Sequence, residues 1–187
     1  TATIQDLKPG IAGDEGTDGS LVAVMRSSTL QDVDAAVDRA QQALRVNDWR
    51  NNGAVRARVL LRFAERVRAN VDGLAELLTR EQGKLHREAR TEVLQTAEMV
   101  EFYAGLSRVI YGRAIALGDT AHGVVLREPI GVVGVITPWN WPLVLMVRAV
   151  APALAAGNAV IVKPASLTPD ITTATLALLA EDPDLPE

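Results

Sequence analysis

Gly131-Val132-Val133-Gly134-Val135-Ile136-Thr137 is the stretch that decides the fold. It is an uncharged, β-branched run, which predicts a strand covered on both faces. Residues 143–156 follow as a predicted helix, in which Pro142 suits the first turn and Gly157 can take the left-handed position that ends it. Residues 159–162 form a second short apolar run. Strand, helix and strand make a βαβ unit, so the predicted fold class is α/β with a parallel sheet.

The chain before this unit is predicted to be mostly helical. Thr29 followed by Asp32 is a helix-start pattern, and Asn51-Asn52-Gly53 separates the first two helices. The remaining predictions are a loose arm over residues 1–26 with one strand at 21–25, helices at 30–44, 55–67, 74–81 and 89–107, a hairpin with strands 111–117 and 123–127, and a last helix at 170–179. We therefore divide the chain at residues 1–110, 111–127 and 128–187.

Composition excludes several classes of function. The 187 residues carry a formal charge of −4, which gives no reason to expect nucleic acid, and the longest apolar stretch is interrupted by prolines and Arg148, which predicts no membrane segment. The first residues lack a secretory pattern, so a cytoplasmic location is expected. With no cysteine and with His86 far from His122, no metal site is predicted. We interpret Arg58, Arg62 and Arg66 as a solvated helix face rather than a site for a polyanion.

The turn Thr137-Pro138-Trp139-Asn140-Trp141-Pro142 is the first candidate for chemistry, because ligands of doubly wound sheets bind at the carboxyl ends of strands. Two interpretations are open. The two tryptophans could fill the gap between sheet and helix while Asn140 caps the helix. Alternatively, the Asn140 carboxamide could donate a hydrogen bond to a developing oxyanion. Lys163 ends the second strand at the same edge, where the ribose or phosphate of a dinucleotide would lie.

Three ordered blocks carry a resemblance to a known family. They are residues 128–143 (EPIGVVGVITPWNWPL), 151–158 (APALAAGN) and 162–169 (VKPASLTP), with weaker similarity at residues 32–37, 81–84, 92–93 and 102–105. Together they resemble the aldehyde dehydrogenase superfamily. The resemblance implies the N-terminal portion of a doubly wound, Rossmann-like cofactor-binding domain with a protruding oligomerisation hairpin. It covers roughly the first two-fifths of a family member, and residues 128–187 would be the first, incomplete βαβ part of that domain.

The family likeness implies an enzyme that oxidises an aldehyde to a carboxylic acid with NAD or NADP. In such enzymes a cysteine forms a thiohemiacetal and then a thioester, which water activated by a glutamate hydrolyses. Asn140 would be the catalytic residue of this chain, donating its amide to the oxyanion. The cofactor-binding residues implied by the match are Ile136, Thr137, Pro138, Trp139, Lys163, Pro164, Ala165 and Ser166. A homo-oligomer, dimer or tetramer, is implied for the complete protein.

Three departures from the family pattern are informative. The nucleophilic cysteine, the general-base glutamate and the glycine-containing cofactor turn of the family would lie beyond Glu187, so the chain alone is expected to be inactive. Ser166 stands where many NAD-preferring relatives carry a glutamate, which predicts tolerance of the NADP 2′-phosphate. A lysine common in the family is Ala149 here. The run of residues 147–150 leans toward members that oxidise aromatic aldehydes of the benzaldehyde, vanillin and salicylaldehyde type.

Two other functions are compatible with the sequence. The chain could be a catalytically dead short protein with a structural or partner-binding role, or a bare dinucleotide-binding module. The second ranks last because half of the implied cofactor site is missing. An intact mass of 20.0 kDa would favour a true short chain, whereas roughly 50 kDa would favour part of an enzyme.

Overall fold

The computed structural model describes residues 11–15, 21–46 and 48–186. In chain order the elements are β1 (Ile11–Glu15), β2 (Leu21–Arg26), α1 (Leu30–Val46), α2 (Gly53–Ala69), α3 (Val71–Gln82), α4 (His86–Leu106), β3 (Arg113–Ala116), β4 (His122–Val125), β5 (Val132–Ile136), α5 (Pro142–Ala155), β6 (Ala159–Lys163) and α6 (Pro169–Ala180). Among these residues, no helix is long and apolar enough to cross a membrane.

The βαβ unit predicted from the sequence is present. β5 and β6 pair in parallel, and α5 joins them with Pro142 in its first turn. Gly157 ends the helix with a φ of 89°, as its position predicts. Asn158 then joins the two ends of the unit, because its side chain accepts from the Gly131 N–H at 3.0 Å and donates to the Ala153 carbonyl at 3.0 Å.

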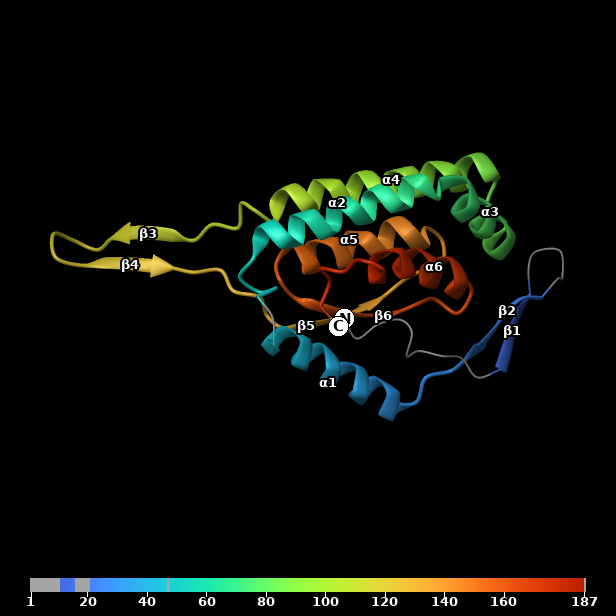
Figure 1. Ribbon diagram of the computed structural model, residues 1–187, viewed down its shortest axis with the longest axis horizontal. Helices are drawn as coiled ribbons and strands as arrows, with labels where there is room; N and C mark the ends of the chain where they lie inside the picture. Colours follow the sequence, from blue (N-terminus) through green and yellow to red (C-terminus); the bar gives the residue numbers. More distant parts are fainter. Residues whose placement is uncertain (1–10, 16–20, 47, 187) are drawn as a thin grey trace.

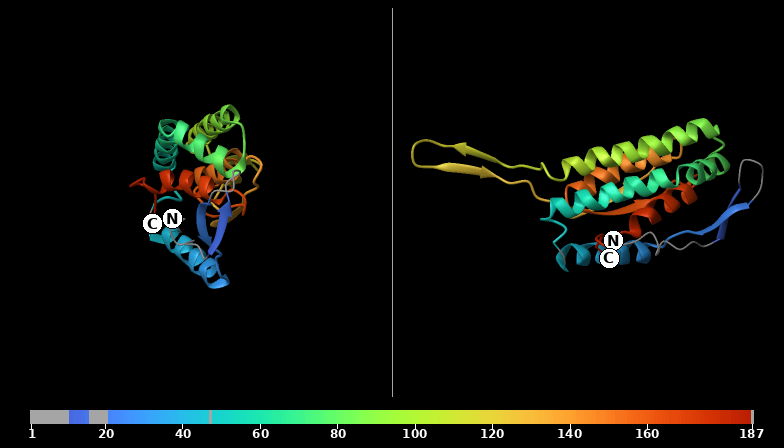
Figure 2. Two further views of the ribbon diagram at one scale, coloured as in Figure 1. Left: turned by 90° about the vertical axis from the view of Figure 1, so that its right-hand side faces the viewer. Right: turned by 45° about the horizontal axis from the view of Figure 1, so that its top comes forward.

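Helices lie on both sides of the two parallel strands (Figures 1 and 2). α5 and α6 lie on one side and are covered in turn by α2 and α4, while α1 lies on the other side. The prediction that β5 is covered on both faces is wrong for the described chain: Val135 is buried, whereas Gly134 and Ile136 are exposed. The reason is that α1 covers only part of its face and leaves a groove of about 580 Å³, partly lined by Val37 and Gly134.

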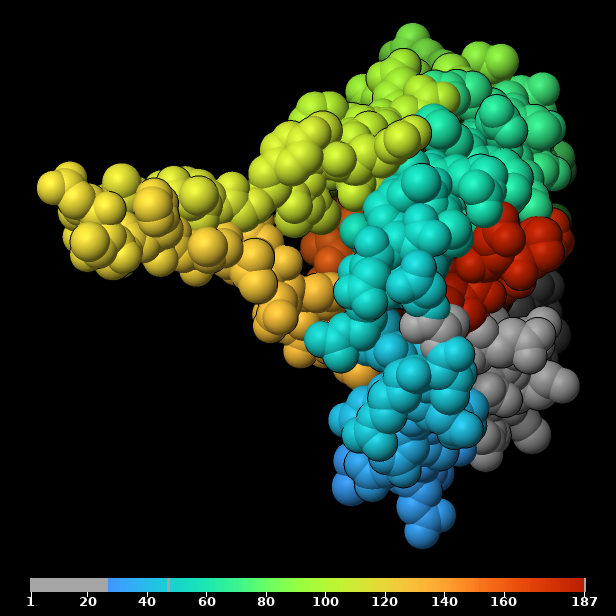
Figure 3. Space-filling view, turned by 60° about the vertical axis from the view of Figure 1, so that its left-hand side comes forward, coloured from blue at the N-terminus to red at the C-terminus, as the bar shows by residue number. Residues whose placement is uncertain are grey.

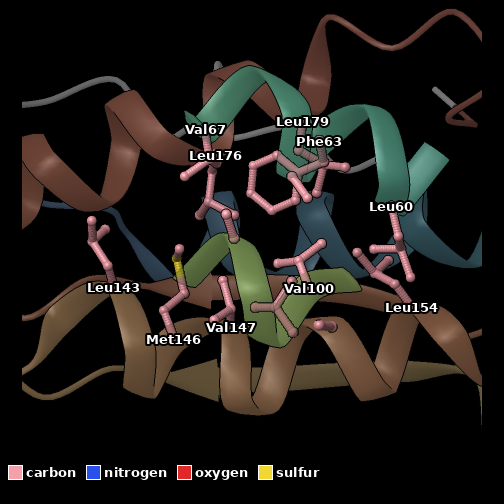
Figure 4. Close-up of a cluster of buried hydrophobic side chains, with 14 of the residues drawn as sticks. Leu60, Phe63, Val67, Val100, Leu143, Met146, Val147, Leu154, Leu176 and Leu179 are labelled. Atoms are coloured by element: carbon pink, nitrogen blue, oxygen red, sulfur yellow. The ribbon is translucent and has the colours of Figure 1, made fainter. Parts of the chain in front are cut away.

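The main hydrophobic core lies between the helices rather than on the strands. Phe63 of α2, Val100 of α4, Met146 of α5 and Leu176 of α6 meet there, all almost fully buried (Figure 4). The apolar region after residue 129 therefore supplies only part of the core. The amphipathic helices that precede it supply the rest.

The amino-terminal helices begin as their sequence predicts. Asp32 Oδ2 accepts from the Thr29 N–H at 2.7 Å, and Thr29 Oγ1 accepts from the Asp32 N–H at 3.2 Å, which is a reciprocal capping box for α1. Asn52 caps α2 by accepting from the Val55 N–H at 3.1 Å. The interpretation of residues 1–26 as an arm with one strand is incomplete, because β1 pairs with β2 in an antiparallel hairpin. Residues 1–10 and 16–20 of that arm lie outside the described residues.

The hairpin predicted with strands 111–117 and 123–127 is also present, and its strands are shorter than predicted. β3 and β4 are antiparallel, with Ala116 opposite His122, and they project from the body of the molecule (Figure 3). Every residue from Val109 to Arg127 is exposed except Gly123. The hairpin is therefore held by its own strand pairing.

Arg58, Arg62 and Arg66 on α2 do not form the freely solvated face that the sequence suggests. Arg62 binds Asp182 and Asp184, at 2.5 and 2.7 Å, while Arg66 and Arg58 contact the same two carboxylates. The Asp182 side chain is fully buried. The two carboxylates that follow α6 therefore neutralise the three arginines. The sequence could not indicate this pairing, because about 120 residues separate the partners.

Candidate functional site at the carboxyl edge of the parallel strands

The sheet brings together the two segments that the sequence singled out. Ile136 and Lys163, the last residues of β5 and β6, are paired in register. The turn that follows β5 is then joined to the turn that follows β6 by Thr137. Its N–H donates to the Lys163 carbonyl at 3.1 Å, and its Oγ1 accepts from the Ala165 N–H at 3.1 Å. Thr137 is itself buried, and its side chain holds the two turns together.

Asn140 is exposed at this edge, in the turn between β5 and α5. Within the described part of the chain, its carboxamide has no hydrogen-bond partner. The alternative that Asn140 caps α5 is wrong, because Trp141 occupies the N-cap position and makes no side-chain cap. The gap-filling alternative does not fit Trp139, which is 54% exposed, whereas Trp141 is 38% exposed. The side chain of Asn140 is thus free to bind another molecule.

A buried carboxylate from α4 caps α5 in place of Asn140. Glu92 is fully buried, and its Oε1 accepts from the backbone N–H of Leu143 at 2.9 Å and of Val144 at 3.4 Å. These are the first two free donors of the helix, because Pro142 has no N–H. A negative charge at a helix amino terminus is also favoured by the helix dipole.

The backbone around Asn140 is held by two side chains that flank Gly83. Gln82 Nε2 donates to the carbonyls of Trp139 and Asn140, at 2.8 and 2.9 Å. Lys84 Nζ donates to the Asn140 carbonyl at 3.0 Å and forms an ion pair with Glu92. The same ammonium lies 4.2 Å from the centre of the Trp141 ring, within the range of a cation–π contact.

The other expected cofactor-binding residues lie beside this turn. Lys163 is exposed, and its ammonium donates to the carbonyl of Pro164 at 3.0 Å. The rest of the set is partly or fully exposed: Ile136, Pro138, Trp139, Pro164, Ala165 and Ser166. One cation, one hydroxyl and several apolar groups therefore face solvent along one edge. This combination suits a ligand with an anionic or hydroxylated part and a flat apolar part.

α6 is capped in the same way as α5. Glu81, at the end of α3, accepts from the Asp170 N–H at 2.6 Å and from the Ile171 N–H at 2.9 Å. The helix likewise begins with a proline, Pro169, so these are its first free donors. Each helix that follows a parallel strand is therefore anchored by a buried glutamate from the helical layer.

Neither buried glutamate was predicted from the sequence to be a site residue. Signals for both exist, because each stands on the apolar face of its helix. Glu92 follows Ala89 by three residues and precedes Thr96 by four, and Glu81 follows Leu78 by three. A carboxylate at such a position is rarely buried without a partner. The described residues contain no group of three or more His, Asp or Glu side chains that could hold a metal.

Comparison with known proteins gives the family. The model of the aldehyde dehydrogenase family matches residues 13–187, so the chain belongs to that family. Among solved structures, it is 36% identical to an aldehyde dehydrogenase from Brucella melitensis biovar abortus 2308, with a TM-score of 0.85 over 94% of this chain and 36% of that one.

Two further structures have similar scores. A structure described as an E. coli NADP-dependent enzyme is 34% identical, with a TM-score of 0.83 over 91% of this chain and 35% of its own. An NAD-dependent benzaldehyde dehydrogenase from Corynebacterium glutamicum is 31% identical, with a TM-score of 0.85 over 95% of this chain and 40% of its own. The chain thus spans well under half the length of each of these relatives.

Proposed function

We propose that this chain is the amino-terminal part of an NAD(P)-dependent aldehyde dehydrogenase, in which Asn140 stabilises the oxyanion formed from the aldehyde. The observation that supports this role is a free, exposed carboxamide on a backbone fixed by Gln82 and Lys84. An amide N–H is a suitable donor, because it does not change protonation state as the charge develops. Neighbouring helices have already ordered the turn that carries it, so little reorganisation is required during the reaction.

The residues of this chain bind and orient, while the bond-forming groups come from elsewhere. The chain contains no cysteine, so the nucleophile that adds to the aldehyde carbon must belong to another part of the protein. When that bond forms, electrons move from the carbonyl double bond onto oxygen, and we propose that the Asn140 carboxamide N–H donates to this oxygen. The nicotinamide cofactor supplies the hydride acceptor.

The edge of the sheet fits a dinucleotide cofactor. Lys163 provides a cation and hydrogen-bond donor beside the end of β6, and the exposed residues Ile136, Pro138 and Trp139 can lie along a flat ring system. Ser166, exposed two residues after Pro164, adds a neutral hydroxyl rather than a carboxylate. A neutral group does not repel a 2′-phosphate, so we propose that NADP is accepted along with NAD. The similar E. coli enzyme is described as NADP-dependent and the Corynebacterium enzyme as NAD-dependent.

The substrate class remains a proposal based on residues 147–150. Their similarity to aromatic-aldehyde members favours a benzaldehyde-type substrate, and one relative is a benzaldehyde dehydrogenase. The most identical of the relatives described above is named only as an aldehyde dehydrogenase, so the comparison does not select a substrate. Equal kcat/KM values for benzaldehyde and for a short aliphatic aldehyde would remove this proposal.

We further propose that residues 1–110 and 128–187 belong to the cofactor-binding domain and that residues 111–127 make oligomer contacts. The hairpin is exposed on both strands and carries large apolar side chains, including Val124 and Leu126, which are 68% and 71% exposed. Exposed apolar groups of this size favour a protein–protein contact. The mass of the native protein, measured by light scattering, distinguishes a monomer from a dimer or tetramer.

The catalytic role of Asn140 is tested in the full-length protein. We expect NAD(P)-dependent oxidation of an aldehyde, and we expect Asn140→Ala to lower kcat by about 10²- to 10³-fold. Ser27→Ala is the matched control, because it removes a polar group from an exposed position before α1. The 187-residue chain alone should be inactive. Full activity in the Asn140→Ala protein would refute the proposed role, and absence of activity in the unaltered full-length protein would refute the assignment.

A further inference from the structure

We propose that Gln82, Lys84 and Glu92 form a clamp that positions Asn140, and that they contribute to catalysis without touching the substrate. This inference rests on the proposed function, because it assigns these residues to the same oxyanion site. They come from the end of α3, the connection after it and the first half of α4, which are distant in sequence from residue 140.

The clamp holds the turn on both sides of Trp141. The Glu92 carboxylate accepts a hydrogen bond from the Leu143 N–H through Oε1 and one from the Lys84 ammonium through Oε2. Lys84 in turn donates to the carbonyl of Asn140. One carboxylate therefore fixes residue 143 directly and residue 140 through the ammonium group. The position of the turn relative to α5 is set by this chain of contacts.

Gln82 supplies a second, independent contact. Its amide nitrogen donates to the carbonyls of residues 139 and 140 at once. The backbone carbonyl of Asn140 thus accepts from two side chains, whereas the carboxamide of the same residue is free. Restraining the backbone limits the directions in which the carboxamide can point. We infer that the clamp acts on catalysis through this restraint.

The charges explain why the clamp is rigid. Glu92 is fully buried and the Lys84 side chain is only 8% exposed, so each charge is compensated mainly by the other. Removing one partner leaves an uncompensated charge in a poorly solvated position, which is unfavourable. Replacing both by methionine removes this problem while keeping similar volume. The clamp can therefore be dismantled without leaving a buried charge.

The test is a double-mutant cycle between Lys84 and Asn140 in the full-length enzyme. We expect Lys84→Met to lower kcat by about 10- to 100-fold, the order of effect of a displaced catalytic group, while the KM for the aldehyde changes by less than about threefold. In the Asn140→Ala background, Lys84→Met should lower kcat no further, because the group that it positions is gone. A general structural role predicts the same loss in both backgrounds, and that result would overturn the inference.

Three further variants distinguish a loss of positioning from a loss of activity caused by misfolding. Gln82→Met leaves the ion pair intact and should show the same dependence on Asn140 with a smaller loss. Lys84→Met/Glu92→Met removes both charges and should lose activity like Lys84→Met. Arg90→Met breaks only the exposed ion pair to Asp72 on the outer face of α4, and it should leave kcat unchanged. Loss of activity in the Arg90→Met protein equal to that in the Lys84→Met protein would count against the clamp.

Amide hydrogen exchange provides a measurement that needs no activity. The Leu143 N–H is protected by Glu92, so the double methionine variant should exchange this proton roughly tenfold faster or more, while Arg90→Met should not change it. Unchanged exchange would overturn the clamp even in an active enzyme. If exchange responds but the unaltered full-length protein oxidises no aldehyde, the clamp stands as a structural feature and the proposed function fails.

Discussion

Truncation of Glu81 should destabilise the protein more than removal of any exposed carboxylate. Its two oxygens accept the Asp170 and Ile171 N–H groups, at 2.6 and 2.9 Å, and these are the first free donors of α6. After Glu81→Ala, the half-buried Asp170 N–H can be hydrated, but the N–H of the fully buried Ile171 cannot. The variant therefore loses both hydrogen bonds and leaves one backbone donor unsatisfied.

The magnitude follows from the character of these hydrogen bonds. A hydrogen bond to a charged group contributes about 1.5–3 kcal/mol, so the two together suggest a loss of about 3–6 kcal/mol. That is a large share of the roughly 5–15 kcal/mol by which domains are stable. With an m-value of about 2–3 kcal/mol/M, the urea midpoint should fall by roughly 1–3 M. Glu81→Gln retains an acceptor oxygen and should lose less.

Urea unfolding at neutral pH, followed by circular dichroism, measures these differences. Glu76→Ala is the matched control, because Glu76 lies on the same helix with an exposed side chain, and its effect should remain within about 0.5 kcal/mol. If Glu81→Ala lowers the free energy of unfolding by less than about 1 kcal/mol, roughly twice the control effect, the anchoring role of Glu81 is wrong.

Three other predictions concern the loop, the ion pairs and the cofactor. Gly157→Ala should destabilise by about 1–3 kcal/mol in thermal unfolding, because φ is positive there and a Cβ would lie 3.0 Å from the Arg50 carbonyl, whereas Gly73→Ala in open space should not. The Arg62 guanidinium, with that of Arg58, lowers the pKa of Asp184. The ionised Asp184 carboxylate therefore stabilises the fold at pH values above its ordinary pKa, and this contribution is lost as the pH falls through the lowered pKa. Arg62→Met should therefore flatten the stability curve measured by urea unfolding below about pH 4, and an unchanged acid limb would contradict the pairing. Ser166→Glu should reduce kcat/KM for NADP relative to NAD by about tenfold or more in the full-length enzyme, and an unchanged ratio would show that Ser166 does not face the 2′-phosphate.

Elements defined by local sequence could be predicted well. The capping pair of Thr29 and Asp32, the strand predicted over residues 131–137 and found as β5, and the left-handed Gly157 each depend on residues within a few positions of one another. The hairpin could be predicted for the same reason. The local prediction that was incomplete concerns the arm before α1. Its glycines and acidic residues gave no indication of a second strand, β1.

The candidate site was only partly predictable. The sequence placed Asn140 and Lys163 at one edge, because parallel strands bring their carboxyl ends together. It did not indicate what holds Asn140, since Glu92 is 51 residues from Leu143, and Glu81 is 89 residues from Asp170. Such contacts depend on how the helices pack rather than on spacing along the chain.

The sequence by itself therefore determined the βαβ unit, the approximate positions of the helices and the family, since each is a property of short-range pattern. Only the tertiary structure decided that two buried glutamates anchor α5 and α6 and that the Asn140 carboxamide is left free. The physical reason is that a buried charge is stable only where folding supplies its partners, and those partners lie in segments that are distant in the chain.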